Sequence, residues 1–211
     1  MIIAIDGPTA SGKGTVAAGV AKRYGLKRLD TGSLYRAVGL AVLDAGDDPG
    51  DERAAAAAAE ALDLAATDEK RIRSSAAGLA ASKVAQLSEV RAILRQAQRA
   101  FAADPAGAVL DGRDIGTVIC PDAEVKLFVT ADLAVRTQRR LGELRARGED
   151  ISFDALQAQI AERDARDMNR ADSPLRQAPD AHLLDTTYLS IEAAVEAACR
   201  IVDAALKRPG A

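Results

Sequence analysis

The chain has 211 residues, of which 48% are hydrophobic, 3% aromatic and 28% charged, and its formal net charge is −3. This length fits one large domain or a core domain with small inserts, and the composition is that of an ordinary globular protein. The weakly negative charge argues against a general nucleic-acid binder. No apolar run approaches the roughly 20 residues of a membrane span, which argues against a membrane partner.

The first strand signal is the apolar stretch Ile2–Asp6, which starts without a basic or hydrophobic leader. We therefore expect no targeting peptide and a cytoplasmic location. The segment GPTASGKGT follows at once and looks like a phosphate-binding turn between a strand and a helix. Glycines let backbone N–H groups approach phosphate oxygens, and the helix points its positive end at the same anion. The residues expected to hold a nucleoside polyphosphate are Gly7, Pro8, Thr9, Ala10, Ser11, Gly12, Lys13, Gly14 and Thr15.

The spacing of this segment is that of a P-loop, with one departure. The residue after the lysine is usually Ser or Thr, which holds magnesium, whereas here it is Gly14 and Thr15 comes one position later. Lys13 supplies a mobile cation for the outer phosphates.

The second strand signal, Leu26–Asp30, runs into the segment LDTGSLYR, which carries the hydroxyl, phenol and guanidinium groups of Thr31, Tyr35 and Arg36. A second substrate can dock on such a turn. The alternative, which the residues support equally, is a plain helix start with Ser33 as its N-cap and Tyr35 in the core.

Turn clusters at residues 46–50 and 104–107 bound a helical excursion over about 51–103, which can carry further substrate-binding residues. Beyond it, the strand Ala108–Asp111 ends on an acid followed by Gly112, Arg113 and Asp114. Asp111 stands where a carboxylate can hold magnesium through water, and Arg113 can follow the charge of a transferring phosphoryl group. Taken alone, a strand-terminal Asp is often only a turn cap.

Every basic residue in the next stretch is arginine: Arg136, Arg139, Arg140, Arg145, Arg147, Arg163, Arg166, Arg170 and Arg176. Guanidinium groups bind phosphate in pairs of hydrogen bonds, so this region can close over a polyanion. The alternative is a solvated helix face with acidic partners, namely Glu143, Glu149, Glu162 and Asp164. Within ERDARDMNR, helical spacing places Arg163, Arg166, Asp167 and Arg170 on one face.

Short apolar runs separated by long helical patterns predict a parallel sheet in an α/β fold, with ligands at the carboxyl ends of the strands. The expected strands are Ile2–Asp6, Leu26–Asp30, Ala108–Asp111, Glu124–Val129 and His182–Asp185. The expected helices are Thr15–Tyr24, Ser33–Ala45, Asp51–Ala66, Leu87–Ala103, Leu133–Arg147, Ser152–Asn169 and Ser190–Lys207. Ser33, Ser152 and Ser190 are expected N-caps.

The chain has two cysteines and one histidine. Cys120 and Cys199 lie far apart without metal-ligand spacing, so we expect unpaired structural thiols. His182, alone of its kind, is expected to be a structural residue in a strand rather than a catalyst.

Five segments together resemble the bacterial cytidylate kinase family, in family order from residue 2 to about 188. They are GPTASGKGT, LDTGSLYR, ASKVA, LDGRDIGTVICPDAEVKLFV and ERDARDMNR followed by SPL. The KGT ending is similar to that of nucleoside monophosphate kinases in general, which accounts for Gly14. The resemblance implies a three-layer α/β/α P-loop fold with a five-stranded parallel sheet, a helical monophosphate-binding insert and a mobile, arginine-rich lid.

The resemblance also implies roles for matching residues. The P-loop would bind ATP, with Lys13, Arg113, Arg136 and Arg163 as catalytic residues and Thr15 and Asp111 near magnesium. The expected CMP-binding residues are Thr31, Tyr35, Arg36, Ser82, Arg91, Arg113, Asp114, Asp167 and Arg170.

Members of the family usually carry an antiparallel stretch ahead of the ASKVA block, and Leu62–Ser75 is too short for one. We therefore expect an abbreviated insert that keeps Ser82 and Arg91. A single kinase domain results, with its core at about 1–50, 104–131 and 179–211, the insert at about 51–103, and the lid with a helical arm at about 132–178.

The implied reaction moves the γ-phosphoryl group of ATP to CMP or dCMP, with Mg²⁺, in pyrimidine nucleotide metabolism. We expect a monomer whose partners are these nucleotides. Two alternatives stay open: a small P-loop kinase acting on another metabolite, and a regulatory module that binds ATP without phosphoryl transfer.

Overall fold

The structure is a computed structural model that describes residues 1–63 and 68–207. Contacts between Cα atoms divide the chain into two compact units. The first comprises Met1–Leu29 and Ala102–Ala211, and the second is Asp30–Phe101. Each unit is described on its own below.

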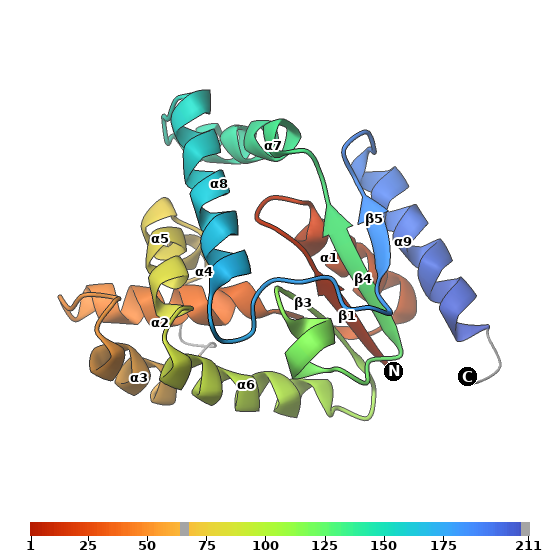
Figure 1. Cartoon of the computed structure of the whole chain (residues 1–211), viewed down its shortest axis with the longest axis horizontal. Helices are drawn as coiled ribbons and strands as arrows, with labels where there is room; N and C mark the ends of the chain where they lie inside the picture. Colours follow the sequence, from red (N-terminus) through yellow and green to blue (C-terminus); the bar gives the residue numbers. More distant parts are fainter. Residues whose placement is uncertain (64–67, 208–211) are drawn as a thin grey trace. The chain divides into compact units, whose positions relative to one another are not determined.

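A five-stranded parallel sheet organises the first unit, in the order β2-β3-β1-β4-β5 (Figure 1). Its strands are β1 (Ile2–Asp6), β2 (Lys27–Asp30), β3 (Ala108–Gly112), β4 (Val125–Thr130) and β5 (His182–Asp185). β1 is central and β3 and β4 flank it, with Ile5 in register with Asp111 on one side and Leu127 on the other. The α/β fold with a parallel sheet predicted from the sequence is confirmed.

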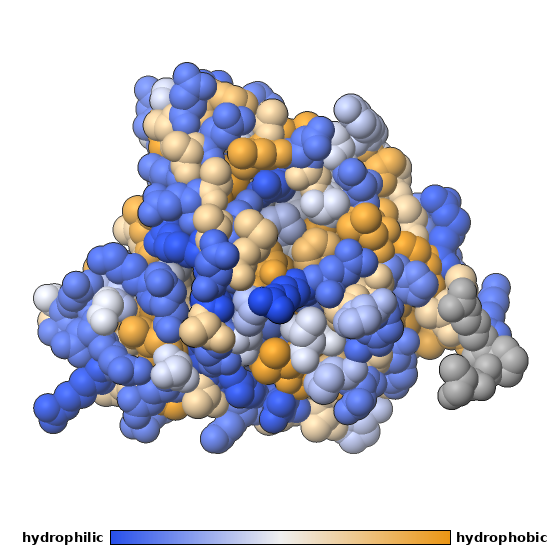
Figure 2. All heavy atoms as spheres, viewed as in Figure 1, coloured by the Kyte–Doolittle hydropathy of each residue, from blue (hydrophilic) through white to orange (hydrophobic). Residues whose placement is uncertain are grey.

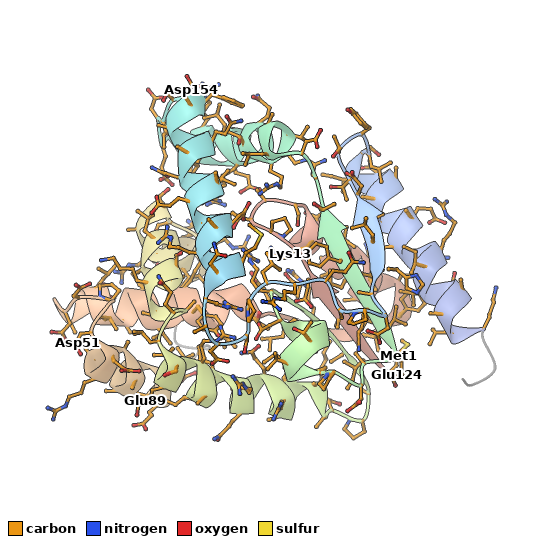
Figure 3. All side chains as sticks on the ribbon, in the orientation of Figure 1. Met1, Lys13, Asp51, Glu89, Glu124 and Asp154 are labelled. Carbon is orange, nitrogen blue, oxygen red and sulfur yellow. The ribbon has the colours of Figure 1, made fainter. Side chains whose placement is uncertain are left out.

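Apolar side chains of these strands form the core with two helices, α1 (Lys13–Tyr24) and α9 (Ile191–Leu206). The two helices approach closely at Gly19, where an added Cβ would lie 2.5 Å from Val195 Cγ1. At the start of β1, Glu124 accepts a 2.7 Å hydrogen bond from the Ile2 N–H, and Figure 3 shows Met1 and Glu124 side by side. Packing of α1 against the sheet fixes the turn that connects them.

Three further helices belong to the first unit. The π-helix Ile115–Ile119 follows β3, and α7 (Leu133–Arg145) and α8 (Phe153–Asn169) pack together through Leu141, Leu144, Leu156 and Ile160. Figure 3 marks the first turn of α8 at Asp154. These two helices carry most of the arginines that the sequence analysis singled out.

The described part of the second unit is helical beyond Asp30. Its helices are α2 (Thr31–Asp44), α3 (Glu52–Glu60), α4 (Glu69–Ile72), α5 (Ser75–Val84) and α6 (Ser88–Ala102), the last of which ends one residue beyond the unit. α2 and α5 pack so closely that a Cβ at Gly39 would lie 2.7 Å from Ala80 Cβ. In the alanine-rich α3, Ala55, Ala56 and Ala59 are buried. Among the described residues of the stretch 62–75 the structure has α4 and no strand, and the abbreviated insert stays a prediction.

Several predicted boundaries are wrong. The expected helix Asp51–Ala66 ends at Glu60, and the last residues of the expected range, 64–66, lie outside the described residues. Ser33 is not an N-cap, because α2 starts at Thr31 and the Ser33 hydroxyl donates to the Asp30 carbonyl at 2.5 Å. α5 and the π-helix were not predicted. Ser152 and Ser190 do cap α8 and α9.

The remaining sequence expectations concern isolated residues and the surface. Cys120 and Cys199 are buried free thiols, and His182 lies in β5, as predicted. Hydrophilic side chains dominate the face of the molecule seen in Figure 2. Across residues 1–63 and 68–207, none of the helices combines the length and apolar character that crossing a membrane requires.

Candidate functional site

The segment between β1 and α1 forms a tight loop (Figure 3, where Lys13 is labelled). Gly7 passes directly beside β4, since an added Cβ would lie 2.0 Å from the Val129 carbonyl oxygen. Ala10 and Gly12 have φ values of 58° and 88°, in the left-handed region. The first N–H groups of α1 have no acceptor within the helix, so this loop presents backbone donors to an anion.

Thr9, near the crest of the loop, is held through three of its atoms. Its N–H donates to Asp164 Oδ1 at 3.0 Å, and its carbonyl accepts from Arg136 Nη1 at 3.0 Å. Its hydroxyl accepts from Arg113 Nη2 at 2.9 Å. Residues from α7, α8 and the end of β3 therefore meet at one residue of the loop.

The GRD segment and α8 form a buried cluster of opposite charges. Arg113 Nε donates to Asp167 Oδ2 at 2.7 Å, and Arg170 Nη2 lies 3.5 Å from Asp114 Oδ1. Burial raises the pKa of Asp167, but the charges of Arg113, Arg163 and Arg170 outweigh it and hold that pKa below its usual range. The structure thus assembles residues that are more than 50 positions apart in the sequence beside the P-loop.

The residues predicted near magnesium give a mixed picture. Thr15 is exposed in the first turn of α1. Asp111 is buried and accepts from Arg28 Nε at 2.9 Å. A Cβ at Gly14 would lie 3.2 Å from Arg28 Nη2 and 3.7 Å from Asp111 Oδ2. The Arg28–Asp111 pair therefore lies beside the position where a P-loop usually has a Ser or Thr side chain.

Residues 1–63 and 68–207 contain no group of three or more His, Cys, Asp or Glu side chains placed to hold a metal ion. The exposed Thr15 hydroxyl is an oxygen ligand of the kind that Mg²⁺ takes beside phosphate.

In the second unit, α2, α5 and α6 bring together a second group of predicted residues. The Arg91 side chain is 2% exposed; its Nη1 lies 3.4 Å from the Tyr35 hydroxyl, and its guanidinium lies 5.9 Å from the ring centre. Arg36 pairs with Asp30 at 2.6 Å, and Thr31 is buried one turn before Tyr35. The buried Ser82 hydroxyl has no hydrogen-bond partner among the described residues. A buried polar atom of this kind is costly unless a ligand satisfies it.

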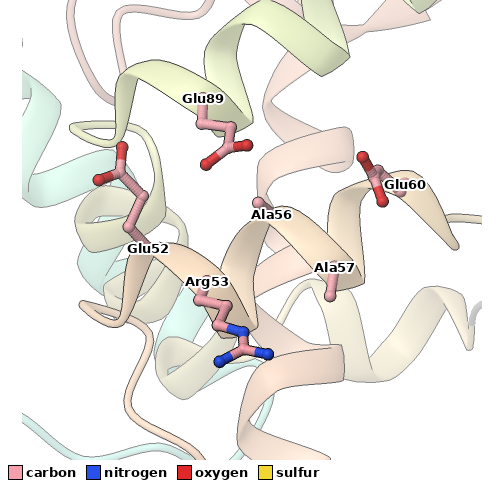
Figure 4. Close-up of a pocket in the computed structure, with 6 residues that line it drawn as sticks. All are labelled: Glu52, Arg53, Ala56, Ala57, Glu60 and Glu89. Atoms are coloured by element: carbon pink, nitrogen blue, oxygen red, sulfur yellow. The ribbon is translucent and has the colours of Figure 1, made fainter.

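A separate cavity of about 380 Å³ lies on the second unit and is lined by Glu52, Arg53, Ala56, Ala57, Glu60 and Glu89 (Figure 4). Three of its side chains are carboxylates against one guanidinium, a balance that disfavours phosphate. None of the predicted site residues lines it, and we assign it no part in the chemistry.

The contacts of three residues near the P-loop, Asp164, Arg28 and Arg139, were not predicted from the sequence. Asp164 was named only as an acidic partner in the alternative of a solvated helix face, and that alternative is wrong for this residue, because it is 6% exposed and its Oδ1 accepts from the Thr9 N–H. Arg28 was overlooked in its short edge strand. Arg139 donates to the Thr186 hydroxyl at 2.9 Å, and that hydroxyl in turn donates to the Ser11 carbonyl. The signal for Asp164 lay in ERDARD, but helical spacing does not tell which face is buried.

Asp6, the last residue of β1, gives a testable pH dependence. Its two carboxylate oxygens accept from the Ile115 and Gly116 N–H groups at 2.9 and 2.8 Å, and burial raises its pKa from 3.8 to about 7. Since the folded protein binds this proton more tightly than the unfolded chain, the resulting stability is present below about pH 4 and is lost as pH rises through 7. We expect the unfolding free energy of wild type, relative to Asp6→Asn, to fall between pH 4.5 and 7.5 in urea titrations. A constant difference between the two proteins across this range contradicts the prediction.

A family model described as cytidylate kinase matches residues 3–204. A protein named cytidylate kinase from Rhodopseudomonas palustris (strain TIE-1) is 56% identical over 204 residues, which cover 97% of this chain and 96% of that protein. One of the same name from Brucella suis biovar 1 (strain 1330) is 56% identical over 205 residues, covering 97% and 94%.

Two solved structures share the fold at low sequence identity. An uncharacterized protein from Eubacterium ventriosum superposes with a TM-score of 0.58 at 15% identity and covers 99% of each chain. TT1252 from Thermus thermophilus superposes with a TM-score of 0.50 at 20% identity and covers 99% of this chain and 98% of its own. These likenesses concern the fold alone. Because the family model spans nearly the whole sequence and the relatives match more than half of the aligned positions over almost their full length, the chain belongs to the cytidylate kinase family.

Proposed function

We propose that this protein transfers the γ-phosphoryl group of ATP to CMP or dCMP and releases CDP or dCDP and ADP. The observation that carries the proposal is the buried cluster of Arg113, Asp167 and Arg170 joined to Thr9 of a P-loop, in a chain of this family. An anion-binding loop beside a guanidinium that reaches it through one hydrogen bond is suited to phosphoryl transfer.

The donor side consists of the loop Gly7–Thr15. Its backbone N–H groups and Lys13 would hold the ATP phosphates, and Lys13 Nζ now rests on the Pro8 carbonyl at 3.3 Å, within the same loop. The Thr15 hydroxyl, and Asp111 through water, would hold Mg²⁺, which would supply positive charge against the phosphates.

The acceptor side would use two groups of residues. The first group would offer the base and phosphate of the monophosphate the buried Ser82 hydroxyl and the buried Arg91 guanidinium, with Tyr35 and Thr31 beside them. Arg36, Asp114, Asp167 and Arg170 complete the proposed set. On this account residues of about 51–103 act as the monophosphate-binding insert and residues of about 132–178 as the lid.

The chemical step needs no covalent enzyme intermediate. An oxygen of the monophosphate attacks the γ-phosphorus of ATP, and the bond from that phosphorus to the β,γ-bridging oxygen breaks, so that the electron pair leaves with ADP. Two like charges about 4 Å apart repel by about 4 kcal/mol at an effective dielectric constant of 20, so cations must surround the reacting phosphates. Arg113 and Arg163 would supply them, and a closed site would exclude water as a competing acceptor.

An assay coupled to ADP release tests the assignment with CMP, dCMP, UMP and AMP as acceptors. We expect the highest kcat/KM with CMP or dCMP. Preference for UMP contradicts the base specificity alone, whereas no turnover with any of the four contradicts the kinase assignment and favours a regulatory ATP-binding module or a different acceptor.

The second unit gives a sharper prediction for acceptor binding. Replacing Arg91 by Met keeps much of its buried length but removes the charge beside Tyr35, and Ser82→Ala removes the unsatisfied hydroxyl. We expect each change to raise the KM for CMP by about 10-fold or more, the cost of one lost hydrogen bond to a charged partner, with the KM for ATP within about twofold. The control is Arg53→Met, on an exposed part of α3. Equal increases in both KM values contradict an acceptor-side role.

A further inference from the structure

We propose that Asp164, acting through its ion pair with Arg136, is a positioning residue for the ATP-binding loop. On this view the pair holds Thr9, and through it Ala10, in the conformation that receives phosphate. The inference rests on the proposed function, because it concerns how the loop of that same donor site is shaped.

The ion pair holds both backbone polar groups of Thr9. Asp164 Oδ1 accepts from the Thr9 N–H, while Asp164 Oδ2 pairs with Arg136 Nη1, the same nitrogen that donates to the Thr9 carbonyl at 3.0 Å. Arg136 Nε also donates to the Ala131 carbonyl at 2.9 Å. A closed ring of hydrogen bonds thus ties α7 and α8 to the two peptide units that flank Thr9.

The burial of this pair separates it from an ordinary helix-surface salt bridge. Asp164 is 6% exposed and Arg136 is 8% exposed. A surface pair contributes at most about 1 kcal/mol, whereas a buried pair is tolerated only when its hydrogen-bonding groups are satisfied. Here the Thr9 N–H and carbonyl supply hydrogen-bond partners for Asp164 and Arg136, so the ion pair and the loop stabilise each other.

The loop conformation requires such support. Ala10 directly follows Thr9 and has a φ of 58°, a value that non-glycine residues adopt at a cost of about 1 kcal/mol or more and keep only where their surroundings impose it. The Thr9 N–H is turned toward Asp164, so the donors left for phosphate lie further along the loop. Fixing Thr9 therefore sets the direction in which those later N–H groups point.

Asp164→Asn tests the proposal. Asparagine keeps the size and an oxygen that can accept from the Thr9 N–H, but it removes the charge opposite Arg136. We expect the dissociation constant for ATP, measured by calorimetry, to rise about 10-fold, with the KM for CMP within about twofold. The matched control is Glu162→Gln, the same change on the same helix at an exposed carboxylate that lies 3.8 Å from Arg166. It should leave both values within about twofold of wild type.

A second variant separates positioning from general loss of structure. Glycine adopts positive φ freely, so adding Ala10→Gly to Asp164→Asn should restore at least part of the ATP affinity. Unchanged ATP affinity in Asp164→Asn overturns the proposal, and so does a loss of ATP and CMP binding together that Ala10→Gly does not relieve. If wild type itself binds no ATP, the proposed function fails first; if wild type binds ATP and Asp164→Asn binds it equally well, only the inference fails.

Discussion

Arg113→Met lowers kcat by about 10²- to 10³-fold, the usual cost of removing one fixed donor to developing charge. The arginine now donates both to Asp167 and to Thr9, so its guanidinium is oriented before any substrate arrives. Methionine keeps the unbranched side chain but loses every donor. The reduction should lie in kcat rather than in the KM for ATP, because the group acts on charge that appears during transfer. Steady-state kinetics with CMP and ATP measure it.

The matched control is Arg23→Met in α1, where the guanidinium lies on the surface 4.0 Å from Glu196. It should leave kcat unchanged. Because Arg113→Met also leaves the buried Asp167 carboxylate without one partner, circular dichroism must show that the variant is folded at the assay temperature. Near-normal kcat in a folded Arg113→Met protein rules out the catalytic role of this arginine.

Gly7→Ala lowers the free energy of unfolding by more than about 3 kcal/mol and abolishes ATP binding. The added Cβ would lie 2.0 Å from the Val129 carbonyl oxygen and 3.2 Å from Ser11 Oγ, at a φ of +155°. The carbonyl belongs to the buried Val129 of β4, an interior strand of the sheet, so β4 and the loop must separate. Urea unfolding and calorimetric ATP titration measure the two effects.

Gly142→Ala is the comparison for this variant, since no described atom lies within 4 Å of a Cβ at that helical position and its φ is ordinary. It should be neutral or stabilising by up to about 1 kcal/mol. An equally small effect of Gly7→Ala would mean that the loop does not pass against β4 as described.

The strands and the P-loop of the first unit were predictable because their signals are local. Every strand except β2 (KRLD) is mainly a short apolar run ending near an acid, and the P-loop is one contiguous segment. α5 escaped prediction because its alanine-rich sequence, SAAGLAASKV, shows no contrast between polar and apolar faces. The structure shows that α5 packs on α2, where Ala80 approaches Gly39 closely.

The candidate site was predictable only in part. The P-loop, the GRD segment and ERDARDMNR were recognised, and the structure shows Arg113, Asp167 and Arg170 in one cluster. The packing of α7 against α8 determines which acidic residue of α8 reaches the loop. Asp164 is buried for this reason, and the sequence does not specify that packing. Gly14, a departure from the P-loop motif, lies beside the Arg28–Asp111 pair, which the sequence did not predict.

Transfer of label from [γ-³²P]ATP tests the central claim most directly. The purified protein is incubated with labelled ATP, CMP and Mg²⁺, and the nucleotides are separated. The proposed function predicts label in the β-position of CDP, with one ADP formed for each CDP. Label released only as inorganic phosphate, or retained in ATP while the protein binds it, contradicts phosphoryl transfer to CMP.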